Sequence, residues 1–197
     1  MNCFCVMMKN KQSKSKFISK ILRHEPPEYP IRVNRKGGWV KISELLPVAG
    51  ITMEDLEEIV ATDEKKRYSF NSDKTCVRAN QGHSIDVDMG FEPQEPPEVL
   101  YHGTGQQNLG SIRKEGLVLK PSGPGKKPRQ YVHLSKDVPT AVNVGHRKGK
   151  VMVLLVRSGE MFRDGYEFFL SENGVWLTKA VPSSYIKFPG ECAGKKE

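Results

Sequence analysis

Two neighbouring cationic side chains, Arg23 and His24, are the first residues in this sequence that could do chemistry, and they stand at the end of a helix-patterned segment. Two prolines at positions 26 and 27 stop the helix just beyond them. A guanidinium can bind a phosphate through two parallel hydrogen bonds, and an adjacent imidazole can bind the same oxygen or exchange a proton with it. The pair therefore fits a phosphate site. A simpler interpretation also stands, because the helix dipole stabilises cations in a last turn without any ligand.

A second polar group follows from the alternation in RQYVHLS, residues 129–135. Successive side chains of a strand point to opposite faces, so Arg129, Tyr131, His133 and Ser135 are predicted to share one face. Four polar or aromatic groups on one face favour a strand that lines a cleft over one packed in a core.

Three further stretches carry candidate ligands. In YHGTG, His102 and Thr104 flank Gly103 at a strand end, where the missing side chain would let a ligand approach the backbone. Arg67 closes the basic run KKR before a predicted hairpin, although a solvated charge run is the simpler explanation. RANQGHS, residues 78–84, is rich in hydrogen-bonding groups and suits either a ligand-facing loop or a turn.

The first half of the chain is predicted to contain three short helices followed by a hairpin. Apolar residues recur at helical spacing in the first and third of these segments, and Thr52 with Asp55 resembles a capping box. This order is typical of a winged-helix module, a frequent nucleic-acid-binding shape with other uses as well. The predicted helices cover residues 13–24, 41–46 and 51–62, and the predicted hairpin strands cover residues 66–70 and 75–79.

The segment DVDMGFEPQEPPE, residues 86–98, has five acids and three prolines and no basic residue, which is the composition of a linker. Beyond it the apolar period changes from 3.6 to 2, with mostly strands and two helices. We therefore predict an α+β protein. The predicted parts are an N-terminal tail (residues 1–12), a first lobe (13–85), the linker (86–98) and a second lobe (99–197).

Composition limits the function classes. The formal charge is +8, and the first 24 residues hold six basic side chains and no acid, which suits a polyanionic partner such as nucleic acid. No apolar run approaches the roughly 18 residues that a membrane span needs. MNCFCVMM lacks the basic start and cleavage site of a signal peptide, so we expect a cytoplasmic protein with no membrane partner. The four cysteines, at positions 3, 5, 76 and 192, lack zinc-site spacing, and we expect them to be reduced.

Six ordered stretches, LRH, KKRYSF, RANQGHS, YHGT, RQYVHLS and NGVWLT, resemble the RNA 2′-phosphotransferase family, usually called tRNA 2′-phosphotransferase. The resemblance covers residues 13–188, nearly the whole chain. It implies an N-terminal winged-helix lobe that binds RNA and a C-terminal lobe, similar to ADP-ribosyltransferases, that binds NAD⁺. It further implies removal of the internal 2′-phosphate left at a tRNA splice junction, with NAD⁺ as co-substrate and no metal.

The family's essential Arg-His-Arg-Arg set falls on Arg23, His24, Arg67 and Arg129. Three guanidiniums could hold a dianionic phosphate, and His24 could protonate the departing 2′ oxygen. The resemblance also implies a set of NAD⁺-binding residues in the second lobe, namely His102, Gly103, Thr104, His133, Ser135, Asn173 and Gly174.

Two departures from the family pattern could alter RNA docking. HEPPEYPIRVNRKGGW is rich in proline and basic residues just after His24, and SGPGKKPRQ places a basic, glycine-rich loop before Arg129. GPGKKP itself lacks the ending of a phosphate-binding P-loop. Two alternatives stay open: transfer of ADP-ribose to a terminal nucleic-acid phosphate or a protein, and an RNA-binding protein without catalysis. We expect a monomer.

Overall fold

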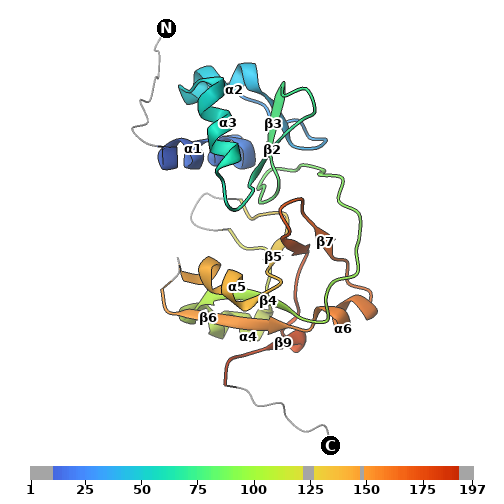
Figure 1. The fold of residues 1–197 in the computed structure, drawn as a ribbon. Coiled ribbons are helices and arrows are strands. Elements are labelled where there is room, and N and C mark those ends of the chain that lie inside the picture. Colours follow the sequence, from blue (N-terminus) through green and yellow to red (C-terminus); the bar gives the residue numbers. More distant parts are fainter. Residues whose placement is uncertain (1–10, 122–126, 147–148, 191–197) are drawn as a thin grey trace, which may run out of the picture. The chain divides into compact units, whose positions relative to one another are not determined.

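The computed structural model describes residues 11–121, 127–146 and 149–190 of the chain (Figure 1). They form two compact units, each with its own core. The first unit contains the residues up to Gly90 together with Gly125–Gln130, and the second contains Phe91–Pro124 and the residues from Tyr131 onward. Most of the predicted tail and of the GPGKKP loop lies outside the described residues, but Lys11 and Gln12 belong to the first helix.

The first unit packs three helices against a small antiparallel sheet. The helices are α1 (Lys11–His24), α2 (Ile42–Ala49) and α3 (Met53–Ala61). α3 begins at the predicted capping box, in which the Thr52 hydroxyl accepts from the Asp55 backbone N–H at 3.2 Å. The strands are β1 (Trp39–Lys41), β2 (Tyr68–Phe70) and β3 (Cys76–Ala79), in the order β1-β3-β2.

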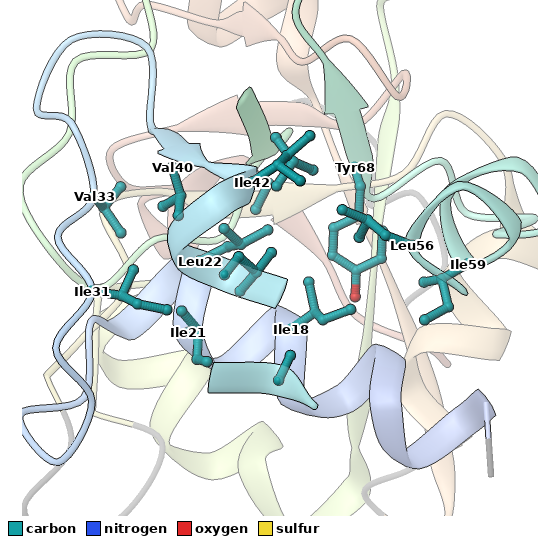
Figure 2. Packing of buried hydrophobic residues seen from close by; sticks show 14 of the residues in the cluster. Ile18, Ile21, Leu22, Ile31, Val33, Val40, Ile42, Leu56, Ile59 and Tyr68 are labelled. Carbon is teal, nitrogen blue, oxygen red and sulfur yellow. The ribbon is translucent and has the colours of Figure 1, made fainter. Parts of the chain in front are cut away.

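The apolar face of α1 enters the core of this unit. Ile18, Ile21 and Leu22 are fully buried, and Figure 2 shows them within one cluster of buried residues that includes Leu56 and Tyr68. The Tyr68 hydroxyl donates to the Ser15 carbonyl at 2.7 Å, which ties the start of β2 to α1. Since burying a leucine or isoleucine side chain contributes about 1.5–3 kcal/mol, these contacts fix the position and rotation of α1.

α1 ends at His24 because Glu25 adopts a left-handed backbone conformation, with φ of 45°. A residue with a β-carbon pays a conformational penalty there, and only local contacts can offset it. The Glu25 carboxylate supplies them by accepting from the Val33 backbone N–H at 3.1 Å and from Arg35 Nη2 at 2.5 Å. The buried Pro26 follows directly. These contacts hold the chain in place immediately after Arg23 and His24.

The second unit contains two three-stranded antiparallel sheets, ordered β4-β6-β9 and β5-β8-β7. Tyr101 and Ser135 exchange two backbone hydrogen bonds of 2.8 Å and so connect one sheet to the other. The strands are β4 (Leu100–Gly105), β5 (Val132–Leu134), β6 (Val151–Val156), β7 (Phe169–Leu170), β8 (Trp176–Thr178) and β9 (Ile186–Lys187). The helices are α4 (Leu109–Glu115), α5 (Val138–Gly145) and α6 (Ser158–Arg163), with 3₁₀ turns at Gln106–Asn108 and Ser183–Tyr185.

The α+β composition agrees with the prediction, as do the three helices and hairpin of the first half. The sequence did not indicate β1, α6 or β7, which are two to six residues long. One prediction was wrong in extent. β5 covers only Val132–Leu134, so His133 is the one residue of the predicted polar face within the strand. Tyr131 and Ser135 flank it, and Arg129 belongs to the first unit. The winged-helix and ADP-ribosyltransferase-like assignments of the two lobes stay predictions.

Close packing of α5 on β4 requires a glycine at position 103. A β-carbon there would lie 1.7 Å from the Ala141 carbonyl oxygen, far inside any van der Waals contact. The sequence predicted an approaching ligand in the space beside Gly103, but the backbone of α5 occupies it.

We expect Gly103→Ala to lower the free energy of unfolding of the second unit by about 1–3 kcal/mol, because helix and strand must separate to admit the methyl group. The matched control is Gly110→Ala, since a β-carbon at that exposed position of α4 meets nothing within 4 Å. Because alanine has a better helix propensity than glycine, Gly110→Ala should raise the free energy of unfolding by up to about 1 kcal/mol. Urea denaturation followed by the NMR signal of the Trp176 indole measures both. Equal stability of the two variants would contradict the packing argument.

Candidate active site

Arg23 is a cation whose side chain is held inside the first unit at the end of α1. Its Nε and Nη2 atoms are buried and have no hydrogen-bond partner among the described residues. Burial lowers the pKa of Arg23 to about 10, and the positive charges of Arg129 and Arg67 act in the same direction. The guanidinium still carries its charge at neutral pH. Because a buried charge without partners is unfavourable, an anion that accepts from these two donors would bind strongly.

Arg67 is positioned by a strained turn. Lys66, just before it, has φ of 43°, and the Lys66 carbonyl accepts from Asn80 Nδ2 at 2.9 Å. The Asp63 carboxylate accepts from the Arg67 backbone N–H at 2.6 Å and also forms an ion pair with Arg67 Nη1. Asp63 thus directs the Arg67 guanidinium and partly balances its charge.

Arg129 joins the first unit through its neighbour Gln130. The Gln130 backbone N–H donates to the His83 carbonyl at 3.1 Å, and Gln130 Nε2 donates to the Val87 carbonyl at 3.1 Å. The structure therefore brings Arg67 and Arg129 close enough to Arg23 for their positive charges to help lower its pKa. Repulsion among three cations is costly without an anion between them, so the cluster favours a multiply charged anion.

His24, exposed beside Arg23, completes the predicted set. Its Nδ1 atom lies 2.8 Å from the Ser84 hydroxyl, and the Ser84 backbone N–H donates to the Arg23 carbonyl at 3.0 Å. All four predicted residues Arg23, His24, Arg67 and Arg129 are thus parts of one unit. Burial of Arg23 Nε and Nη2 favours a phosphate site over a helix end that happens to be basic. The ion pair between Arg67 and Asp63 is compatible with either a phosphate site or a solvated charge run.

The stretch RANQGHS forms the support of this cluster, which its composition had indicated only as a loop or a turn. Asn80 and His83 are 3% and 2% exposed, respectively. Burial lowers the pKa of His83 to about 4, and the nearby charges of Arg23, His24 and Arg78 add to the effect. His83 is therefore neutral at pH 7 and adds no further charge to the three arginines.

The residues predicted to bind NAD⁺ all lie in the second unit. His102 Nδ1 is 3.0 Å from the His133 carbonyl, which connects β4 to β5, and Ser135 continues this connection through its bridge to Tyr101. Thr104 is buried, and its hydroxyl accepts from Asn108 Nδ2 at 3.1 Å. His102 and Thr104 lie within β4, and His133 lies within β5. Ser135 directly follows β5, and Asn173 and Gly174 precede β8.

Asn173 and Gly174 form a tight turn before β8. Asn173 Oδ1 accepts from the Ser171 hydroxyl at 2.8 Å, and Gly174, with φ of 74°, donates its N–H to the Ser171 carbonyl at 2.8 Å. A glycine suits this left-handed position.

Three lysines of α1 form ion pairs, so the helix carries less uncompensated positive charge than its residue count indicates. Lys11 pairs with Glu58, Lys14 with Asp55 and Lys20 with Glu28, at 2.7, 2.9 and 2.7 Å. These carboxylates reduce the positive potential near α1, so the arginine cluster is the stronger site for a phosphate.

Comparison with known proteins assigns the chain to a family. The profile of the "RNA 2'-phosphotransferase, Tpt1 / KptA family" matches residues 9–180. The chain belongs to this family. Proteins named "Probable RNA 2'-phosphotransferase" from Flavobacterium johnsoniae and Burkholderia pseudomallei are 46% and 44% identical to it, over 90% and 89% of this chain and 96% and 94% of theirs. One of the same name from Fusobacterium nucleatum is 46% identical over 92% of this chain and its own full length.

Neither a membrane-spanning helix nor a metal-binding group of side chains occurs in the described part of the chain. None of its helices is long and apolar enough to cross a bilayer. Nowhere in residues 11–121, 127–146 and 149–190 do three or more His, Cys, Asp or Glu side chains gather as a metal site would require.

Buried His83 should make the first unit acid-sensitive. Between its ordinary pKa of 6.5 and its folded value of about 4, the unfolded chain binds a proton that the folded chain does not, so stability falls as the pH falls through this range. The drop from 6.5 to about 4 corresponds to a loss of about 3 kcal/mol. His83→Gln removes this contribution, so the stability difference between wild type and variant should narrow on acidification. Urea denaturation at several pH values, followed by the Trp39 indole NMR signal, tests this; parallel curves would contradict it.

Proposed function

We propose that this protein is an NAD⁺-dependent RNA 2′-phosphotransferase that removes an internal 2′-phosphate, such as a tRNA splice-junction phosphate, from RNA. The observation that carries the proposal is the clustering of Arg23, Arg67 and Arg129, with two buried and unpartnered donors on Arg23. The products would be RNA with a 2′-hydroxyl, nicotinamide and ADP-ribose 1″,2″-cyclic phosphate.

The first step needs little from the protein beyond placement. An oxygen of the RNA 2′-phosphate attacks ribose C1″ of NAD⁺, and the bond from C1″ to nicotinamide breaks, which leaves RNA 2′-phospho-ADP-ribose. The phosphate is already an anion and needs no general base. Arg23, held rigidly by α1, and Arg67, held by Asp63, bind and orient it.

In the second step the O2″ hydroxyl attacks the phosphorus, and the bond from phosphorus to the RNA 2′ oxygen breaks. Negative charge builds on the phosphoryl oxygens, where three guanidiniums can stabilise it. The departing 2′ oxygen takes up a proton as the O2″ hydroxyl loses one. His24, hydrogen-bonded to Ser84 and beside Arg23, is suited to supply the proton to the 2′ oxygen.

NAD⁺ would bind to the second unit through His102, Gly103, Thr104, His133, Ser135, Asn173 and Gly174. The connected strands β4 and β5, together with the left-handed Gly174, bring backbone and side-chain hydrogen-bonding groups into one unit. We expect the protein to act in the cytoplasm as a monomer, without a metal.

The direct test mixes the protein with NAD⁺ and a short RNA that carries one internal 2′-phosphate, without metal, and follows RNA and nucleotide products by mass spectrometry. Loss of the phosphate together with ADP-ribose cyclic phosphate supports the proposal. A stable ADP-ribosylated product with no cyclic phosphate would instead indicate ADP-ribose transfer. RNA binding without nicotinamide release would indicate a non-catalytic protein.

Arg129→Ala should slow the second step by on the order of 10²-fold or more, because it removes a charge that contacts the transition state. The ADP-ribosylated RNA should accumulate, and single-turnover mass spectrometry would detect it. Arg32→Ala is the matched control, since it removes an exposed arginine of the same unit outside the cluster. If Arg129→Ala turned over as fast as Arg32→Ala, the assignment of Arg129 would be wrong.

A further inference from the structure

The short segment Asn80–Ser84 touches the chain at or beside every member of the arginine cluster. The Asn80 backbone N–H donates to the Arg67 carbonyl at 2.8 Å, and the His83 carbonyl accepts from the residue after Arg129 at 3.1 Å. Gly82, with φ of 91°, lies flat against Arg23, where a β-carbon would sit 3.4 Å from its Nε. The fourth contact is a hydrogen bond between two side chains.

That contact joins the Ser84 hydroxyl to His24 Nδ1 at 2.8 Å. His24 is an exposed side chain at a helix end, where an imidazole ordinarily samples several rotamers. Ser84 itself is fixed, because its backbone N–H donates to the Arg23 carbonyl at 3.0 Å. The Ser84 main chain is thus held at the end of α1, which keeps its hydroxyl within hydrogen-bonding reach of the His24 ring.

We propose that Ser84 is a positioning residue for His24. Its hydroxyl accepts a hydrogen bond from Nδ1–H and so fixes both the orientation of the ring and its protonation pattern. The two nitrogens lie on opposite sides of an imidazole, so a hydrogen bond at Nδ1 directs Nε2 away from Ser84. The hydrogen bond at one nitrogen decides which form the other takes. Nε2, which is unprotonated in this neutral ring, can then take the proton that the O2″ hydroxyl loses and pass it to the departing 2′ oxygen.

The inference rests on the proposed function for its catalytic consequence, but its structural part can be measured without turnover. Ring ¹⁵N chemical shifts of His24 distinguish a protonated from an unprotonated Nδ1 in the free protein. Ser84→Ala removes the hydroxyl but keeps the backbone hydrogen bond to Arg23. Ser84→Thr keeps both, and the half-buried site leaves the added methyl partly in solvent. Ser43→Ala is the matched control, because Ser43 is an exposed serine of α2 in the same unit.

We expect wild type, Ser84→Thr and Ser43→Ala to show His24 with Nδ1 protonated, and Ser84→Ala to show a mixture of tautomers. With the 2′-phosphorylated RNA and NAD⁺, Ser84→Ala should lower kcat about tenfold and leave KM unchanged, because loss of one hydrogen bond misorients the ring without removing the arginines. Ser84→Thr should restore kcat. If Ser84 only stabilised the fold, restoring the hydroxyl in Ser84→Thr would not selectively restore kcat.

Two results would overturn the inference without touching the proposed function: an unchanged His24 ring in Ser84→Ala, or wild-type kcat in Ser84→Ala when His24→Ala is inactive. If the wild type itself did not turn over the RNA, the proposed function would be wrong. The ring shifts would then decide the positioning of His24 alone, with an unchanged ring in Ser84→Ala again overturning it.

Discussion

The buried guanidinium of Arg23 is the constraint on which the first unit depends. Two of its nitrogens have no hydrogen-bond partner among the described residues, and they are tolerated because the apolar face of α1 is anchored in the core directly before it through Ile18, Ile21 and Leu22. Burial of those three side chains offsets the cost of desolvating the cation next to them. Two neighbouring residues add no further unfavourable charge: Gly82 lies against the Arg23 side chain, and His83 stays neutral beside it.

The second unit is organised differently, because the residues predicted to bind NAD⁺ lie on or beside its strands rather than at the end of a helix. His102 and Ser135 connect its two sheets through hydrogen bonds to the backbone. The tight contact between α5 and Gly103 then fixes the register of β4 against the helix. The same side chains thus serve packing and would serve a ligand, so substitutions there need stability controls before any loss of activity is interpreted.

Sequence patterns predicted what depends on local periodicity and capping. The helix that ends at His24, the capping box at Thr52 and the alternation of Val132 and Leu134 with polar residues all appear in the structure. Local patterns could not place Arg129 with Arg23 and Arg67, and only the family resemblance grouped them, because hydrogen bonds such as that between Gln130 and His83 join residues 47 positions apart. Nor could composition show that RANQGHS is buried support, since hydrogen-bonding groups look alike whether they face a ligand or the protein. The roles of the predicted site residues stay predictions until turnover is measured.

The left-handed backbone at Glu25 and Lys66 has a consequence for stability. Each residue adjoins a member of the cluster, His24 in one case and Arg67 in the other, and each adopts a conformation that glycine would hold at lower energy. A glycine at position 25 would relax the chain but remove the carboxylate that binds Val33 and Arg35. At position 25, relief of the backbone strain would therefore remove contacts that hold the chain beside His24, so local stability and the placement of the imidazole oppose each other there.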